Sequence, residues 1–166
     1  MDEKTMRLCL VLSIGVWSLA TPAFAEDLGC KPIHTLIRDL NAAKQARLIN
    51  HWINDGSNNF GTQEVILVDW SEYSRWEEGP WSINQREFTP DAVSNCHKLR
   101  DEIVNGVSTL LYIYDLRDYG SKLQVRTWIN KDTGLPLQSQ FITVDPKNFE
   151  ERLTTYSFDT DIRAPM

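Results

Sequence analysis

Apolar residues recur at helical spacing near the start of the chain's polar region. They predict an amphipathic helix from Pro32 to about Gln45. Pro32 suits the first turn, where a backbone N–H has no helical partner. From Leu48 to Trp52 the spacing shifts towards two, and this stretch stays ambiguous between helix and strand. The apolar positions of the predicted helix are Ile33, Leu36, Ile37 and Leu40.

From residue 63 onward the pattern is one of short strands with turns between them, which is typical of an antiparallel sheet. Gln63–Trp70 is apolar on both faces and is predicted to be a central strand. Asn105-Gly106 is the strongest hairpin signal in the chain, because both residues tolerate positive φ. Further strands are predicted at Leu99–Val104, Val107–Asp115, Lys122–Asn130, Leu137–Val144 and about Glu150–Phe158.

Turns and one short helix complete the predicted elements. Tyr73–Ile83 carries aromatic residues around a tight turn at Glu77-Glu78-Gly79-Pro80. Thr89 followed by Pro90 is a helix-start signal, with threonine as the cap, and predicts a short helix over about Pro90–Asn95. Clusters of small and polar residues predict turns at Asp55–Asn59 and Lys131–Gly134.

Alternation along the strands predicts a sheet with two different faces. Within Lys122–Asn130, Leu123, Val125, Thr127 and Ile129 point one way, and Gln124, Arg126 and Trp128 point the other. One helix cannot cover about seven strands, so the sheet must curl or leave part of a face open. We therefore expect an α+β fold: a strongly curved antiparallel sheet of about seven to eight strands, an unclosed half-barrel packed on one N-terminal helix plus a short helix. A concave apolar side is a natural ligand cradle.

The first 25 residues are predicted to be a secretory signal peptide. Lys4 and Arg7 precede a short apolar run, Leu8–Ala20, and an A-x-A site ends at Ala25. The run is too short to span a membrane, so we expect no integral membrane segment. A buried N-terminal helix is the alternative. Residues 26–166 are then expected to form a single domain that is periplasmic or secreted. The sequence leaves open whether translation starts at Met1 or at Met6.

The charge and the cysteine content indicate further which partners and cross-links the protein has. The net charge is −6 and no basic cluster is present, which argues against nucleic acid as a partner. After cleavage only Cys30 and Cys96 remain, in an oxidising compartment, so we expect a disulfide between them. Closing so long a loop stabilises the fold by about 4 kcal/mol in the chain-entropy description.

No catalytic or metal-binding constellation is recognisable, and we expect neither an enzyme nor a cofactor. Cys96 and His97 are adjacent on a strand, so their side chains point to opposite faces and cannot act together. The same argument separates Asp101 from Glu102. The histidines at 34, 51 and 97 are scattered without metal-ligand spacing.

Aromatic residues are the remaining candidates for function. Five tryptophans after residue 26 exceed what one small core requires, so some of the aromatic side chains are expected to line a cavity or an exposed patch. The candidate cavity-wall residues are Trp52, Trp70, Tyr73, Trp76, Trp81, Tyr112, Trp128 and Tyr156.

The order of several short motifs resembles that of exported bacterial proteins with the LolA-like lipoprotein-carrier fold. Its most specific part is Trp128-Ile129 followed by Thr133-Gly134-Leu135-Pro136 and a closing tyrosine strand. The resemblance covers about Gly61–Pro165 and rests also on Tyr73, Trp76, Gly79-Pro80-Trp81, Cys96, Asp101–Gly106, Tyr112, Tyr156, Asp159, Ile162 and Ala164-Pro165. It implies an unclosed curved sheet wrapped over helices, with an apolar cavity between them, and no catalysis. Carriers of this fold are larger and have more helical cover.

Two functions follow as expectations. The first is a non-enzymatic protein that binds an apolar small molecule or lipid on the concave face. The second is an envelope protein-interaction module that holds another protein by an aromatic patch or an open sheet edge. A secreted hydrolase is a third and weaker hypothesis, because each acid, base and nucleophile constellation sought is missing.

Overall fold

The structure is a computed structural model that describes residues 29–54, 58–85, 92–118, 121–144 and 150–165. It contains one helix, α1 (Lys31–Ala42), followed by nine strands in the described residues. The predicted signal peptide and its cleavage site lie outside these residues, as does the start of the chain. The strands are β1 (Gln45–Asn54), β2 (Asn58–Val68), β3 (Ser71–Trp76), β4 (Ser82–Gln85), β5 (Val93–Val104), β6 (Val107–Asp118), β7 (Ser121–Asn130), β8 (Pro136–Thr143) and β9 (Glu151–Ser157).

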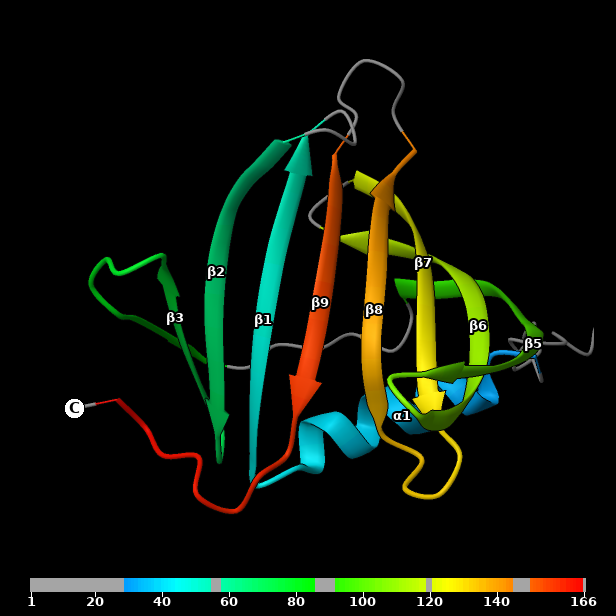
Figure 1. The fold of residues 1–166 in the computed structure, drawn as a ribbon, viewed down its shortest axis with the longest axis horizontal. Coiled ribbons are helices and arrows are strands. Elements are labelled where there is room, and N and C mark those ends of the chain that lie inside the picture. Colours follow the sequence, from blue (N-terminus) through cyan, green and yellow to red (C-terminus); the bar gives the residue numbers. More distant parts are fainter. Residues whose placement is uncertain (1–28, 55–57, 86–91, 119–120, 145–149, 166) are drawn as a thin grey trace, which may run out of the picture.

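All nine strands form one unclosed antiparallel sheet in the order β4-β3-β2-β1-β9-β8-β7-β6-β5 (Figure 1). Neighbouring strands are consecutive in sequence except β1 and β9, whose pairing joins the two ends of the domain. The curved antiparallel sheet is therefore as predicted, but the strand number of seven to eight is too low. The additional strand is β1, which lies in the stretch that the apolar spacing left ambiguous.

The helix ends earlier than predicted, because Ala43 is already extended, with φ −60° and ψ 126°. Gln45 therefore begins β1. Leu48 and Trp52 share one face of that strand while Ile49 and Ile53 share the other, and this mixture hid the strand period of two.

Three of the predicted turns are confirmed, at Glu77–Pro80, Asn105-Gly106 and Lys131–Gly134. Asn105 and Gly106 have φ of 51° and 80°, as a two-residue hairpin turn requires. The N–H of Gly79 donates to the carbonyl of Trp76 at 2.8 Å and closes the β3–β4 turn. The carbonyl of Asn130 accepts from Gly134 at 2.9 Å in the β7–β8 turn. Residues 55–57 of the turn predicted at Asp55–Asn59 lie outside the described residues, and Asn58 and Asn59 belong to β2.

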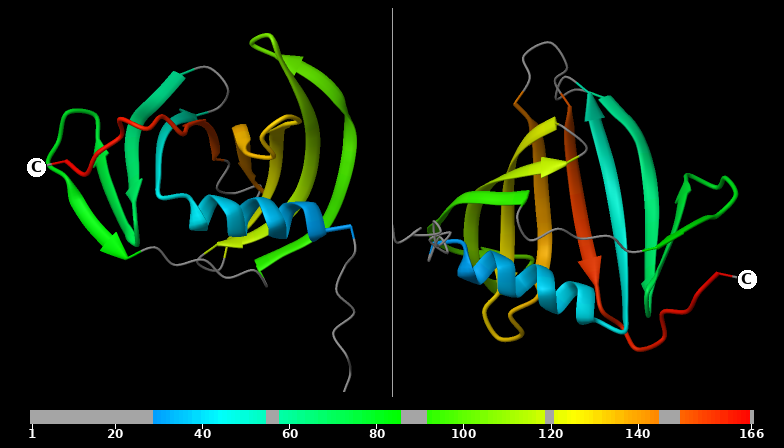
Figure 2. Two further views of the ribbon diagram at one scale, coloured as in Figure 1. Left: turned by 90° about the horizontal axis from the view of Figure 1, so that it is seen from below. Right: turned by 180° about the vertical axis from the view of Figure 1, so that it is seen from behind.

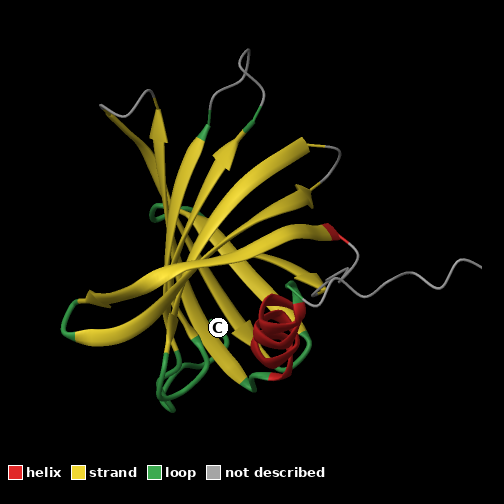
Figure 3. Cartoon of the chain, turned by 90° about the vertical axis from the view of Figure 1, so that its right-hand side faces the viewer, coloured by secondary structure: helices red, strands yellow, loops and turns green. Residues whose placement is uncertain are grey.

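The helix lies in the concave side of the curved sheet (Figure 2). Ile33, Leu36 and Ile37 are its buried residues, and they pack on apolar side chains of β5, β6, β7 and β8. Near its end, Leu40 packs on a second apolar cluster formed by Ala46, Val65 and Leu67 of β1 and β2. Seen from the side, β5 and β6 bend across one end of the sheet (Figure 3). We call the face towards α1 the inner face and the opposite one the outer face.

The short helix predicted over Pro90–Asn95 ends earlier than predicted. Ala92 has 3₁₀ conformation, but Val93, Ser94 and Asn95 already belong to β5; Pro90 and Asp91 lie outside the described residues. A β-bulge stands there instead. Val93 and Cys96 are both buried although they are three residues apart, a spacing that puts residues of a regular strand on opposite faces. Asn95 has φ of 54° and lies within a register shift between β5 and β6. The extra residue turns Cys96 inward.

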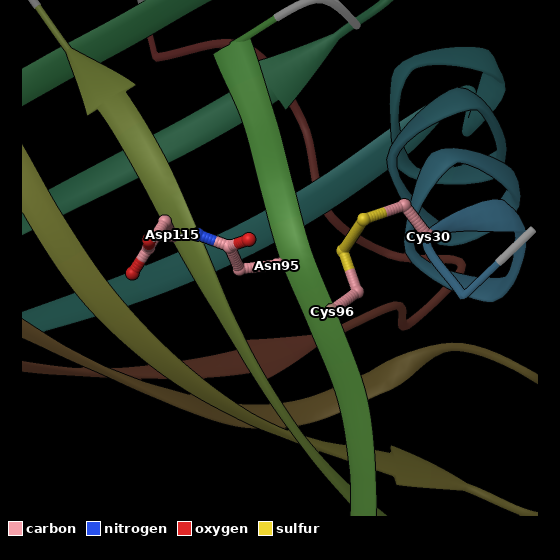
Figure 4. Close-up of a disulfide and its surroundings, with 4 residues drawn as sticks. All are labelled: Cys30, Asn95, Cys96 and Asp115. Atoms are coloured by element: carbon pink, nitrogen blue, oxygen red, sulfur yellow. Dashed lines mark hydrogen bonds between the residues drawn. A yellow bond between two sulfur atoms is a disulfide. The ribbon is translucent and has the colours of Figure 1, made fainter. Parts of the chain in front are cut away.

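The bulge makes the predicted disulfide possible. Cys96 points from β5 towards Cys30 at the start of α1, whereas Asn95 points away from the helix towards Asp115 (Figure 4). The Cα atoms of the two cysteines are 4.9 Å apart and the disulfide is formed, as the sequence predicts. Asn95 donates to the Asp115 carboxylate at 2.6 Å. The disulfide fixes the beginning of α1 to the edge strand β5.

A pair of substitutions at Asn95 tests the bulge. Asn95→Val and Asn95→Gly both lose the amide hydrogen bond to Asp115, so the difference between them isolates the backbone. We expect Asn95→Val to be less stable than Asn95→Gly by about 1–2 kcal/mol, because a β-branched residue resists positive φ. Urea unfolding of both variants measures this difference. Equal stability of the two would show that the bulge does not depend on a left-handed residue.

Candidate functional site

The strand register sorts the inner face into three rows that cross the sheet. The first row is apolar: Val65 of β2, Leu48 of β1 and Tyr156 of β9 are cross-strand neighbours. The second row, which we call the polar row, is Gln63, Asn50, Thr154, Ser139 and Thr127 on β2, β1, β9, β8 and β7. The third row is Gly61, Trp52, Arg152, Phe141 and Val125 on the same five strands.

The polar row is hydrogen-bonded, and all its members are buried except Gln63, which is half-buried. Asn50 donates to the side chain of Gln63 at 2.9 Å and accepts from Thr154 at 2.6 Å. The hydroxyl groups of Thr127 and Ser139 are 2.9 Å apart. Because a slip of one residue would break these side-chain bonds and expose the inner face, the polar row helps fix the strand register.

Two tyrosine hydroxyls extend the polar row. Tyr114 of β6 lies 3.2 Å from the hydroxyl of Thr127, and Tyr156 donates to Ser139 at 3.3 Å. Burial raises the pKa of both phenols above the ordinary value near 10. Both side chains therefore stay protonated in the folded protein at neutral and moderately alkaline pH.

These raised pKa values predict alkaline destabilisation. In the unfolded chain tyrosine ionises near about pH 10, whereas the folded protein holds both phenols neutral. Stability is then fully present below about pH 10 and falls as the pH rises beyond it. Urea midpoints measured between about pH 8 and 11 should fall less steeply for the double variant Tyr114→Phe, Tyr156→Phe. Identical slopes for variant and parent would contradict a role for these two phenols.

Three residues of the third row form an aromatic cluster with Trp76 of β3, which pairs with Gln63. We call this the inner aromatic cluster: Trp52, Trp76, Phe141 and the cation Arg152. The ring centroids of Trp52 and Trp76 are 5.6 Å apart. The guanidinium of Arg152 lies over Trp52 at 5.0 Å and over Phe141 at 4.2 Å. These distances are in the range of cation–π contacts.

Glycine opposite Trp52 makes room for the rings. Gly61 pairs with Trp52 across β1 and β2 and has φ of 149°. A Cβ atom there would lie 3.5 Å from the Trp76 ring. Trp76 packs over this glycine and remains 49% exposed. Neither Trp52 nor Trp76 belongs to the two apolar clusters beneath α1.

Trp52 carries an unsatisfied donor within this cluster. Its indole Nε1 is buried, and within the part of the chain that the structure describes it has no hydrogen-bond partner. Buried polar groups are almost always hydrogen-bonded, and an exception calls for an explanation. The inner aromatic cluster therefore combines apolar ring surface, a positive charge and the unsatisfied indole N–H of Trp52.

The eight aromatic residues singled out from the sequence do not form one wall. Register places four of them on the inner face: Trp52, Trp76, Tyr112 and Tyr156. Tyr73 and Trp128 are on the outer face, and Trp81 lies there too, stacked on Arg75 at 4.6 Å. Trp70 is not at the end of the predicted central strand but in the β2–β3 turn, where it is 78% exposed.

The outer-face aromatics have structural partners. Arg75, over which Trp81 stacks, bonds the buried carboxylate of Glu64 at 2.6 Å, and Arg47 bonds its other oxygen at 2.7 Å. The indole of Trp128 donates to Glu102 at 2.7 Å. These residues are engaged within the sheet.

Phe141 and Arg152 were missed by sequence reasoning, which considered only tryptophan and tyrosine. The signal that could have found them is alternation. Arg152 has the same parity as Thr154 and Tyr156 in the last predicted strand, and Tyr156 was already a candidate. A cation on the face otherwise assigned to the core is unusual enough to mark the position.

The residues considered for catalysis take part in structural interactions instead. Cys96 is in the disulfide and His97 is exposed, so the pair forms no nucleophile. Lys131 and Lys98 hold the pKa of Asp101 at about 2, which keeps that carboxylate ionised. Among the described residues no group of three or more His, Cys, Asp or Glu could hold a metal ion. No described helix is long and apolar enough to cross a membrane.

Comparison with known proteins establishes the fold. No family profile and no curated protein matches the chain. Among solved structures, the chain is similar to the Mycobacterium tuberculosis lipoprotein LppX, with a TM-score of 0.55 at 10% identity over 80% of this chain and 95% of that one. LprF from Mycobacterium bovis gives 0.48 at 9% identity over 83% and 94%. The Pseudomonas aeruginosa MucA/MucB complex gives 0.45 at 14% identity over 77% and 58%.

At these identities the similarity concerns the fold alone. The resemblance to the LolA-like lipoprotein-carrier fold that the sequence motifs predict is confirmed at that level.

Proposed function

We propose that the chain is a non-enzymatic protein of the periplasm, or a secreted one, that binds a lipid-like or other apolar ligand on the inner face of the sheet. The observation that carries the proposal is the inner aromatic cluster. Its Trp76 ring is half exposed on the concave side, outside the apolar clusters that α1 covers. An exposed ring on a concave face is a surface that an apolar ligand removes from water.

Two further features support a binding role. The LolA-like fold supplies a curved sheet with a concave side. The predicted signal peptide would deliver the chain to the envelope, where lipids and lipoproteins are exported. Because the best-defined candidate groups for catalysis are held in ion pairs or the disulfide, binding explains the site better than chemistry does.

Two matched tryptophan variants test the proposal. Titration of the protein with oleate or the dye ANS is expected to change tryptophan fluorescence or dye emission saturably. Trp76→Ala should weaken binding by about tenfold or more, since a buried aromatic contact contributes one to several kcal/mol. Trp70→Ala removes an indole that is 78% exposed in the β2–β3 turn and should leave binding unchanged.

Two outcomes would contradict the proposal: no apolar probe binds the native protein, or both variants bind as the parent does. Mass spectrometry of an organic extract of protein purified from its native envelope gives an independent reading. A co-purified amphiphile in about equimolar amount is expected.

A second candidate function is an envelope protein-interaction module. The edge strand β4 carries no charged residue, and its Ile83 is 66% exposed on the outer face beside Tyr73. An uncharged edge strand can accept a further strand. A stoichiometric protein partner that cross-links at β4, together with an extract free of lipid, would favour this function over ligand carriage.

A further inference from the structure

The two edge strands of the sheet differ in how they are protected against pairing with another chain. An edge strand presents backbone donors and acceptors, and charged residues, prolines and bulges discourage a further strand from pairing with them. Edge strand β5 carries Lys98, Arg100, Asp101 and Glu102, and its register shifts twice against β6. The opposite edge strand, β4, has no charged residue and no proline, and it pairs with β3 without a register shift.

An apolar row on the outer face ends at β4. Ile66 of β2, Tyr73 of β3 and Ile83 of β4 are cross-strand neighbours. Exposure rises along this row, because Ile66 is buried, Tyr73 is half-buried and Ile83 is 66% exposed. A strand added beside β4 would place a side chain next to Ile83, and an apolar side chain there would be removed from water together with Ile83.

The turn that leads into β4 carries two negative charges. Glu77 and Glu78 are exposed in the β3–β4 turn, and none of the ion pairs among the described residues includes either carboxylate. Arg75, the cation that precedes them on β3, is bonded to Glu64 at 2.6 Å. Opposite charges on neighbouring strands attract and like charges repel, so a segment with lysine or arginine near this turn is favoured over an acidic one.

We propose that β4 binds an extended, basic segment of another protein as a further strand, with an apolar residue beside Ile83 and a lysine or arginine beside Glu77 and Glu78. The four residues of β4 limit the added strand to a short segment. Backbone pairing then supplies part of the affinity and the side-chain contacts supply the specificity. The net charge of −6 disfavours a second copy of this acidic chain as the occupant and favours a basic partner.

This inference gives the second candidate function its site and its class of partner. It does not depend on ligand binding by the inner face, because Ile83 and Tyr73 lie on the outer face.

Four synthetic peptides test the inference. They share the core Thr-Val-Thr-Ile-Thr, with two lysines, two glutamines or two glutamates at each end; the fourth is the lysine peptide with proline at the central position. Binding to the full protein is measured at low salt, up to about 1 mM peptide. The lysine peptide should bind about fivefold more tightly than the glutamine peptide, as two exposed ion pairs provide, and the glutamate peptide should bind most weakly. The proline peptide should not bind, since proline cannot donate to the ladder.

Hydrogen exchange locates the bound peptide. The lysine peptide should slow exchange of backbone amides in β4 and leave those of β5 unchanged, because only paired amides are protected. Ile83→Lys places a charge on the edge strand and should weaken binding of this peptide by about tenfold or more. Leu99→Lys makes a similar change at a residue of β5 that is 48% exposed, and it should leave binding unchanged.

A matched pair of double variants isolates the role of charge. Glu77→Gln with Glu78→Gln should bind the lysine and glutamine peptides with similar affinity. Asp132→Asn with Glu150→Gln also removes two exposed carboxylates, but away from β4, and should retain the preference for lysine. Circular dichroism shows whether each variant is folded. If Ile83→Lys is not, the two double variants carry the test.

Several results would overturn the inference: no binding of the lysine peptide, equal binding of the glutamate peptide, or protection of β5 in place of β4. A dimer of the native protein that Ile83→Lys abolishes would show that a second copy occupies β4, and would overturn it too. Titration of the same samples with oleate tests the proposed function separately, and Ile83→Lys should bind oleate as the parent does. Peptide failure with intact oleate binding refutes this inference alone, whereas oleate failure with intact peptide binding refutes ligand binding alone.

Discussion

Replacing Cys30 and Cys96 together with serine is expected to lower the free energy of unfolding by about 4 kcal/mol. The disulfide closes a loop with a sequence separation of 66. Closing a loop of this length lowers the conformational entropy of the unfolded chain, and this stabilises the folded state by about 4 kcal/mol. It also fixes the start of α1 to β5. We therefore expect removal of the disulfide to weaken first the packing of the helix on the inner face.

Chemical unfolding of three samples measures this effect. The double serine variant and the reduced parent should unfold at similar denaturant concentrations, both well below the oxidised parent. The agreement between variant and reduced parent is the control, because it separates loss of the cross-link from the change of side chain. A midpoint for the double variant equal to that of the oxidised parent would mean that the disulfide contributes nothing to stability.

Truncating Ile33 to alanine is expected to destabilise the protein by about 2–4 kcal/mol, the usual cost of a cavity in a well-packed core. Ile33 is fully buried in the cluster between α1 and strands β5 to β8. Ile83→Ala makes the same chemical change at a site that is 66% exposed in β4, and it should cost less than about 1 kcal/mol.

The comparison is made by urea unfolding, with ANS emission as a second reading. Loss of the Ile33 anchor should also raise ANS emission, because α1 is the described element that covers the apolar part of the inner face. Equal destabilisation by Ile33→Ala and Ile83→Ala would contradict the position of the helix.

Local signals in the sequence predict the hairpins and the helix well. Asn105-Gly106 specifies its turn through backbone preference alone, and the helical spacing of Ile33, Leu36 and Ile37 identifies the buried side of α1. Strand β1 and the bulge at Asn95 were not predicted. Their conformation depends on partners distant in sequence, β9 for the first and Cys30 for the second.

The candidate site could be predicted only as a class of residues. Composition points to aromatic side chains, but the face on which each one lies depends on register across five strands. Trp76 and Trp128 look alike in sequence, yet one is half exposed on the inner face and the other donates to Glu102 on the outer face. Arg152 acquires its significance only when β9 is placed between β1 and β8.

Photo-cross-linking with a diazirine-bearing fatty acid, followed by mapping of the modified residues, tests the central claim most directly. The account predicts saturable labelling on inner-face positions of β1, β2, β3, β8 and β9 around Trp52, Trp76 and Phe141, suppressed by an excess of unlabelled oleate. Labelling confined to the β2–β3 turn around Trp70 and to the outer face around Ile83, or labelling that oleate does not suppress, would contradict it.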